Sequence, residues 1–199
     1  MGYEEQKYIT VKFLLKENDM SKNKSFYLQM VNQIQTAKDN AQSAQIISET
    51  FQNLLPLCLP FVRKYADEDL PIVTGIIDAV TKCLIKQMDN MEKYMLEMVL
   101  ESVSVTTTEI SEHKSIYRIL FNTDTPDEFE IAVKRSMGDI AKAYVAELDK
   151  FQAEDWPMVI GICKCLYLAR EEKMSEKDRY LKQQVLTKAY DIAANQWGW

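Results

Sequence analysis

The stretch EDLPIVTGI at residues 68–76 returns as EDWPMVIGI at residues 154–162, and this repeat is the strongest indication of the fold. The offset is 86 residues, from 154 minus 68. Upstream of each copy, KSFYLQMVN at residues 24–32 returns as KSIYRILFN at residues 114–122, with an offset of 90, from 114 minus 24. A chance match would not keep nearly one register over so long a distance. The sequence therefore predicts an internal duplication.

In both copies the repeated stretch has the pattern of a helix start. A Glu-Asp pair precedes a proline, whose missing N–H costs nothing in a first helical turn, and acidic side chains suit the positive end of the helix dipole. A glycine follows four residues after the proline, and mid-helix glycine costs about 1 kcal/mol relative to alanine. Its recurrence favours close packing of another backbone over a small-molecule contact. We interpret the matched residues as structural: Glu68, Asp69, Pro71, Gly75, Glu154, Asp155, Pro157 and Gly161.

The acidic pairs also admit a functional interpretation. If the two copies face each other, the four carboxylates would line a shared cleft that could hold a cation or a basic peptide. Helix capping explains them without a ligand, and we favour that interpretation.

Hydrophobic periodicity predicts an all-α fold in which each copy contributes roughly four helices. Apolar residues recur at three- and four-residue spacing, and the chain holds only five glycines and five prolines in 199 residues. This scarcity of turn formers favours long helices over many short strands. The predicted helices span residues 24–36, 41–65, 70–87 and 89–106 in the first copy, and 113–122, 126–151, 155–173 and 175–195 in the second.

The duplication divides the chain into three parts. An N-terminal arm covers residues 1–23, and the two helical repeat units cover residues 24–110 and 111–199. The units form either two domains or one continuous domain.

The arm follows a different pattern from the repeat units. Apolar residues alternate with other residues, which is the period of a strand. A single strand in a helical protein has no internal ladder partner, so it would pair with another subunit or add to a partner's sheet. The alternatives are a short helix or a leader that packs against the helices. The alternating residues are Ile9, Val11, Phe13 and Leu15.

Charge and hydropathy exclude two classes of partner. The net charge is −6 and no dense run of Lys or Arg occurs, which argues against nucleic-acid binding. The most apolar stretch, residues 70–85, carries Asp78 and Lys82 and is shorter than the roughly 20 apolar residues that span a membrane. No apolar leader opens the chain. We therefore expect a soluble cytoplasmic protein.

The sequence contains no motif of a known catalytic or metal site. The single histidine, His113, lies at a predicted helix start, and no glycine-rich phosphate loop is present. Zinc sites need cysteine pairs of a different spacing or several histidines. We expect buried thiols, no metal and no cofactor; the cysteines are Cys58, Cys83, Cys163 and Cys165.

The leading functional hypothesis is a non-enzymatic helical module for protein–protein interaction. It would be an adaptor, an assembly component or an acidic inhibitor that binds a protein partner or another copy of itself. The alternative is a helical bundle that binds a small hydrophobic ligand between the two repeat units, and an enzyme of unfamiliar type comes third. Besides the four apolar arm residues, the candidate interaction residues are the three tryptophans, which are enriched in interfaces: Trp156, Trp197 and Trp199.

Overall fold

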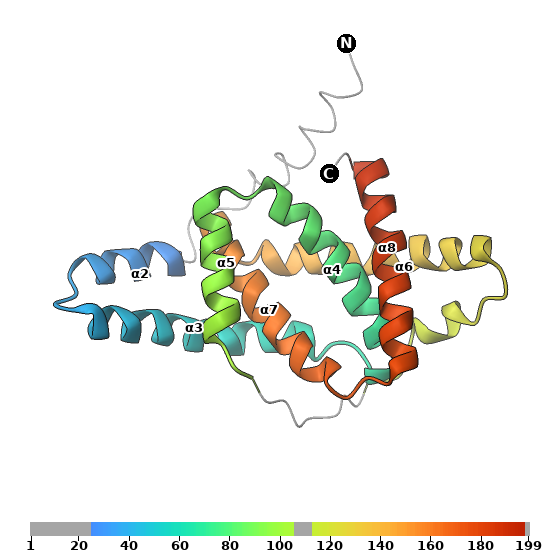
Figure 1. The fold of residues 1–199 in the computed structure, drawn as a ribbon, viewed down its shortest axis with the longest axis horizontal. Coiled ribbons are helices and arrows are strands. Elements are labelled where there is room, and N and C mark those ends of the chain that lie inside the picture. The colour runs from blue at the N-terminus through green and yellow to red at the C-terminus, as the bar shows by residue number, and fades with distance from the viewer. Residues whose placement is uncertain (1–24, 106–112, 198–199) are drawn as a thin grey trace, which may run out of the picture.

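The computed structural model describes residues 25–105 and 113–197, with side chains through Asn195, and its regular elements are all helical (Figure 1). This confirms the all-α class. The α-helices are α2 (Phe26–Gln35), α3 (Asn40–Val62), α4 (Leu70–Gln87), α5 (Asn90–Ser102), α6 (Pro126–Leu148), α7 (Trp156–Glu171) and α8 (Glu176–Trp197). The short 3₁₀ helices are η1 (Asp67–Asp69), η2 (Arg118–Phe121) and η3 (Ala153–Asp155).

Local sequence signals fix several helix starts. Asp89 and Thr125 each form a capping box with the glutamate three residues later, at the beginnings of α5 and α6. Pro71 and Pro157 lie in the first turns of α4 and α7, where no intrahelical N–H is needed. These starts agree with the predicted helix boundaries.

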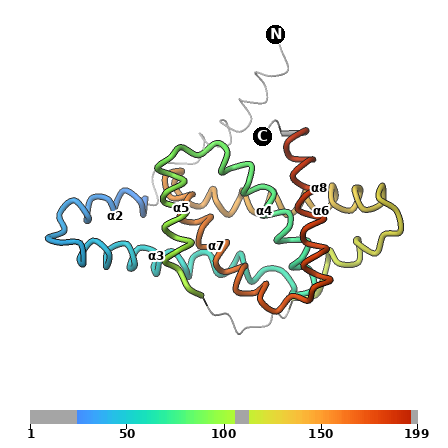
Figure 2. Tube along the Cα trace, in the orientation of Figure 1, coloured from blue at the N-terminus to red at the C-terminus, as the bar shows by residue number. Residues whose placement is uncertain are grey.

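The two halves of the chain pack by exchanging their helices. We call residues 25–105 the first half and residues 113–197 the second half. α4 packs against α8, and α5 packs against α7, so the last two helices of each half lie against those of the other. Figure 2 shows these four helices in the centre, with the α2–α3 hairpin projecting to one side and η2 with the start of α6 to the other.

A single cluster of buried apolar side chains runs through both halves. Phe61 of α3 stacks on Tyr144 of α6, with ring centroids 5.8 Å apart, and meets Tyr167 of α7 edge-on at 6.3 Å. Aromatic pairs in these geometries add to the hydrophobic stabilisation of a core. Neither half therefore buries its apolar faces alone.

The predicted helix over residues 113–122 is wrong in extent. Only Arg118–Phe121 is helical there, as the 3₁₀ helix η2. The residues before it turn around a carboxylate of the first half, as shown below, and their N–H groups are engaged there instead of beginning an α-helix. Among the described residues, no helix combines the length and the apolar character needed to cross a membrane. The predicted strand-like arm lies outside the described residues.

Candidate functional site

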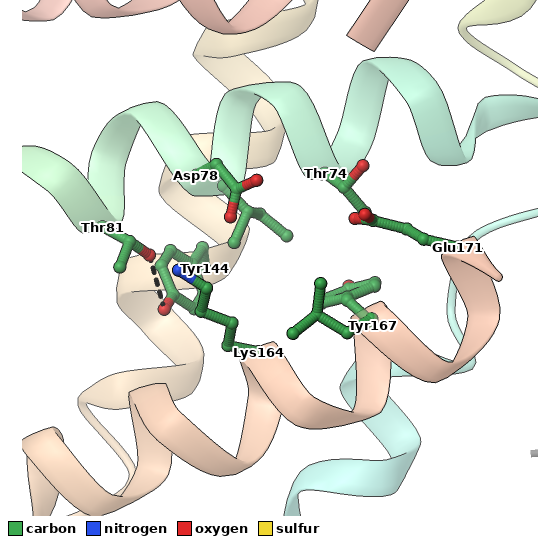
Figure 3. Close-up of a pocket in the computed structure, with 9 residues that line it drawn as sticks. Thr74, Asp78, Thr81, Tyr144, Lys164, Tyr167 and Glu171 are labelled. Atoms are coloured by element: carbon green, nitrogen blue, oxygen red, sulfur yellow. Dashed lines mark hydrogen bonds between the residues drawn. The ribbon is translucent and has the colours of Figure 1, made fainter. Parts of the chain in front are cut away.

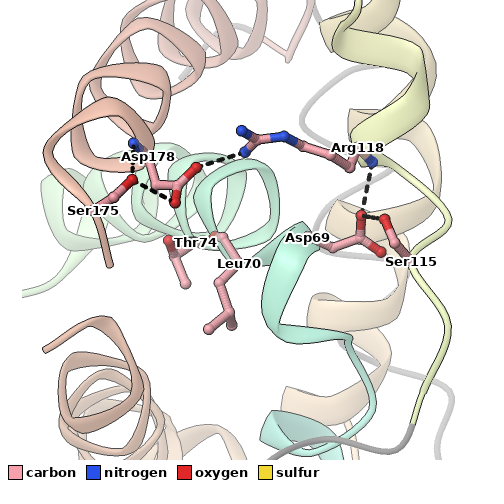
Figure 4. A network of polar contacts seen from close by, with 7 residues as sticks. All are labelled: Asp69, Leu70, Thr74, Ser115, Arg118, Ser175 and Asp178. Atoms are coloured by element: carbon pink, nitrogen blue, oxygen red, sulfur yellow. Dashed lines mark hydrogen bonds and ion pairs between the residues drawn. The ribbon is translucent and has the colours of Figure 1, made fainter. Parts of the chain in front are cut away.

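Two buried aspartates each hold a segment of the opposite half. Asp69 accepts hydrogen bonds from the Ser115 hydroxyl at 2.6 Å and from three successive backbone N–H groups, those of Ile116, Tyr117 and Arg118, at 2.7–2.9 Å (Figure 4). Four donors on one carboxylate compensate its burial, since only 1% of Asp69 is exposed.

The matching aspartate makes a smaller version of this contact. Asp155, also 1% exposed, accepts from the Ser25 hydroxyl at 2.9 Å and the Tyr27 N–H at 2.7 Å. It therefore anchors the start of α2. Neither aspartate caps the helix that follows it, so the expected capping role is wrong for both: they bind the first segment of the other half. Their sequence neighbours, Glu68 and Glu154, are exposed.

An ion pair extends the contact around Asp69. Arg118 donates to Asp178 at 2.8 Å, and Asp178 also accepts from the Ser175 hydroxyl at 2.8 Å at the start of α8 (Figure 4). Desolvation opposes ionisation of Asp178, but these hydrogen bonds and the Arg118 charge outweigh it and lower the pKa of the carboxyl. The network joins η2 to α8 and presents no unpaired charge to a ligand.

The two repeated glycines lie where the exchanged helices cross. A Cβ atom on Gly75 would lie 2.9 Å from the Lys182 carbonyl oxygen and 3.0 Å from Val185 Cβ in α8. A Cβ atom on Gly161 would lie 2.8 Å from Val99 Cβ in α5. Both glycines therefore permit close helix approach, in agreement with the packing interpretation.

The centre of the molecule has room for about one water molecule. A cavity of about 10 Å³ lies between α4 and α7 (Figure 3). The Thr81 and Tyr144 hydroxyls lie 3.1 Å apart beside it. Burial raises the pKa of Tyr144, so this phenol stays protonated.

The two carboxylates that line this cavity, Asp78 and Glu171, are paired. Lys182 of α8 contacts Asp78 at 2.8 Å and Glu171 at 2.7 Å. Desolvation alone would lower the pKa of Lys182, but the two carboxylates raise it above its ordinary value. The lysine is therefore held as a cation between two anions, which is the arrangement of a structural ion pair.

All four cysteines are buried free thiols. The pKa of Cys163 is raised by a hydrogen bond with Cys58 and by burial, so it is held as an unreactive thiol. No group of three or more His, Cys, Asp or Glu side chains within residues 25–105 and 113–195 is placed to hold a metal ion. His113 is exposed.

An open groove between α3 and α5 is the best candidate for a binding site. Its volume is about 310 Å³. Ile47, Phe51 and Leu55 of α3 form one apolar wall, and Met98 with Val103 forms the other. Ala44 and four uncharged polar side chains complete the lining: Ser48, Gln52, Ser102 and Ser104.

The walls of the groove are nearly free of charge. α3 carries a single ionisable residue, Glu49, and α5 beyond Tyr94 carries only Glu97 and Glu101. All three glutamates are exposed. Glu97 and Glu101 stand one position before the lining residues Met98 and Ser102, so they lie about 100° to one side of the lining face of α5. The lining itself is therefore apolar and uncharged polar, with acidic residues only at neighbouring positions.

The matching place in the second half is closed. The helices that correspond to α3 and α5 are α6 and α8, which pack against each other. Glu130 of α6 accepts from Lys188 of α8 at 3.0 Å and pairs with Lys134 at 2.7 Å. An ion pair thus bridges the seam at one of two matching positions, and an apolar groove lies at the other.

A second groove, of about 260 Å³, has a mixed-charge lining. Asp67, Glu68 and Asp178 oppose Arg170 and Lys173 around Leu70 and Met174. Arg170 is 7% exposed and donates to the carbonyls of Val62 and Tyr65 and to Asp67, so it ties α7 to the end of α3. The Arg170 charge is therefore already paired within the fold.

Of the predicted interaction tryptophans, Trp156 is the one whose side chain lies in the described part of the chain. Trp156 occupies the position that matches Leu70; it is partly buried and packs against the core. Its indole N–H has no partner among the described residues. The side chain of Trp197 and the whole of Trp199 lie outside the described side chains.

Sequence reasoning did not single out the groove residues. A signal was available, because α3 has a single charge, Glu49, in a 23-residue helix whose other exposed positions are Asn, Gln, Ser, Ala, Pro and Leu57. A helix that faces only water normally carries more charge. Comparison with protein-family models, curated proteins and solved structures found no match for this chain in any of the three.

Proposed function

We propose that this chain is a protein-interaction module, and that the α3–α5 groove binds a partner segment that carries both apolar and basic side chains. The observation that carries the proposal is the groove itself: about 310 Å³, lined by apolar and uncharged polar side chains. Its apolar lining supplies affinity, and the glutamates next to lining positions in the sequence, Glu49, Glu97 and Glu101, favour lysine- or arginine-bearing segments.

The shape of the groove favours a peptide over a small molecule. Sites for small ligands enclose most of the ligand surface, whereas helices and extended segments bind in open surface grooves between secondary-structure elements. The groove lies on the surface between two helices, and exposed polar residues such as Ser48 and Gln52 border it. An adaptor, an assembly component and an inhibitor would all use such a groove.

The alternative of a hydrophobic ligand between the two halves has less support. The cavity described at their junction has a volume of about 10 Å³, and Gly75 and Gly161 already touch the opposing helices. An enzymatic role has no favouring observation either, since Asp78 and Glu171, the carboxylates that line that cavity, are both paired with Lys182. The cytoplasm remains the expected compartment, because buried free thiols suit reducing conditions.

We also propose that the two halves are duplicated units that interlock. Three pairs of contacts support this. Gly75 contacts Val185 as Gly161 contacts Val99, and Asp69 binds Ser115 as Asp155 binds Ser25. In the third pair, α4 packs on α8 as α7 packs on α5. Each residue of the first two pairs has its counterpart at the offset of 86 or 90 read from the sequence. In each case a residue of one half contacts the other half.

A peptide-display selection tests the binding function. The immobilised full-length chain would be presented with a random peptide library, and the enriched peptides measured by fluorescence anisotropy. We expect enrichment of peptides that combine two or three apolar residues with lysine or arginine. Met98→Lys, which places a charge in the groove, should weaken their binding at least ten-fold.

The matched control is Gln184→Lys. Gln184 is exposed on α8 at the position that corresponds to Met98, from 184 minus 86, and its substitution should leave peptide affinity within two-fold of the parent. Circular dichroism establishes that both variants are folded. Absence of enriched peptides, or equal binding by parent and Met98→Lys, would contradict the proposed function.

A further inference from the structure

We infer that the chain's own N-terminal segment, residues 7–16, occupies the α3–α5 groove when no partner is bound. The inference rests on the proposed function, because it names the internal competitor of that site. It joins the apolar groove, on helices whose nearby charged residues are glutamates, to a basic and apolar segment outside the described residues.

The residue composition of the segment suits the groove. The segment KYITVKFLLK at residues 7–16 contains three lysines and no acidic residue. Its alternation places Ile9, Val11 and Phe13 on one side of an extended chain, and Lys12 with Lys16 on the other. Apolar side chains would meet the apolar lining of the groove, and the positive charge of the segment complements the glutamates at neighbouring helix positions, Glu97 and Glu101.

The segment is also attached to the chain close to the groove. The described chain starts at Ser25, which Asp155 fixes at the beginning of α2. α2 packs along α3 after a short turn, which brings its first residue back beside the middle of α3, where Phe51 lines the groove (Figure 1). The eight residues from Glu17 to Lys24 span up to about 28 Å when extended, more than the roughly 16 Å of helix between Ala44 and Leu55.

The tether also raises the effective concentration of the segment. A connection of this length gives an effective concentration in the millimolar range, so even a weak groove–segment contact is populated. The second half has no such competitor, since its corresponding seam is closed by the Glu130–Lys188 pair. A partner must displace the segment before it binds.

Photo-crosslinking of the full-length chain tests the inference. Benzoylphenylalanine replaces Phe13, and the control chain carries it at Tyr3, outside the basic–apolar segment. After irradiation the chain is digested and crosslinked peptides are identified by mass spectrometry. We expect crosslinks from position 13 to residues 44–55 or 98–104 within one 23.1 kDa chain, at least ten-fold above those from position 3.

Two further variants make the assignment specific. Met98→Lys in the same chain should reduce the crosslink yield at least five-fold, whereas Gln184→Lys should not change it. In a chain without the photoprobe, Phe13→Asp should raise the affinity of the selected peptides several-fold by removing their competitor. Crosslinks that map outside the two segments, or that occur only between two chains, would overturn the inference.

The two proposals fail in different ways. If position 13 crosslinks to the groove but no library peptide binds, the segment is a fixed part of the fold, and only the proposed function fails. If selected peptides bind and lose affinity in Met98→Lys while position 13 crosslinks elsewhere, the proposed function stands and the inference fails.

Discussion

The seam between α3 and α5 and the seam between α6 and α8 occupy matching positions in the two halves but differ in chemistry. In the second half, Glu130 of α6 pairs with Lys188 of α8 across the seam and with Lys134 of its own helix. In the first half the corresponding residues are Ala44, Ser102 and Ser48, at an offset of 86, and a groove of about 310 Å³ remains.

The helices themselves show the same contrast. α3 and α6 each have 23 residues, and α3 has a single charged residue. The charged residues of α6 are Asp127, Glu128, Glu130, Lys134, Arg135, Asp139, Lys142 and Glu147. The same arrangement of helices can therefore have an ion pair across this seam or leave the seam as an apolar surface. The choice depends on a few positions that do not contribute to the core.

The largest expected effect comes from the two anchoring aspartates. Asp69→Ala leaves four donors without their acceptor and should cost about 3 kcal/mol of unfolding free energy. Asp155→Ala removes two such bonds and should cost about 2 kcal/mol. Urea unfolding followed by circular dichroism measures both, with exposed Glu68→Ala as a control that stays within about 0.5 kcal/mol. Equal stability of Asp69→Ala and the parent would contradict the anchoring role.

Three helical glycines provide the next test, because they differ only in what surrounds them. Gly75→Ala and Gly161→Ala drive a methyl group to within 3 Å of the opposing helix and should each lose about 2 kcal/mol. Gly138 in α6 has no neighbouring atom within 4 Å of the added Cβ, so Gly138→Ala should gain about 0.5–1 kcal/mol. Thermal unfolding of the three variants is sufficient. A stabilising Gly75→Ala would show that the helix crossing is loose.

Transplanting the closed seam into the first half should abolish the groove. The double variant Ala44→Glu with Ser102→Lys introduces the residues that stand at the matching positions of α6 and α8. We expect it to reduce the affinity of the selected peptides at least ten-fold, about 1.4 kcal/mol. Ala44→Glu alone lacks the pairing lysine and is the control, with a smaller loss. Unchanged peptide affinity in the double variant would locate binding elsewhere.

The smallest expected effect is a difference in acid sensitivity between the seams. Hydrogen bonds from Lys134 and then Lys188 lower the pKa of Glu130 to about 2. A carboxylate whose pKa is depressed on folding contributes stability above its unfolded pKa, and this is lost as pH falls towards 2. Between pH 5 and pH 2, Glu130→Gln should therefore lose less stability than the parent. Identical pH slopes for the two proteins would show that these ion pairs contribute nothing.

Much of the fold followed from local signals in the sequence. The proline and acidic residues before α4 and α7, and the caps at Asp89 and Thr125, placed those helix starts within a residue or two. The error at residues 113–122 has a tertiary cause. Local propensity there is compatible with a helix, but Asp69, far away in sequence, takes up the N–H groups that begin it.

The candidate site was harder to predict. A groove is an absence of packing between two helices, and periodicity does not reveal which partner a helix face will meet. The exchange of helices between the halves depends on contacts such as Gly75 with Val185, which are distant in sequence. The low charge of α3 was visible, but it became informative only when α6 was known to occupy the matching position.

The most direct test of the account is a chemical-shift map of peptide binding. A selected peptide would be titrated into the ¹⁵N-labelled full-length chain, and amide shifts followed in both halves. If the α3–α5 groove is the binding site, we expect the amide shifts of residues 44–55 and 98–104 to change. The amide shifts of the matching residues 130–141 and 184–190 should stay the same. Shifts confined to the second half, or spread evenly over both seams, would contradict the claim that the uncharged α3–α5 seam is the binding site.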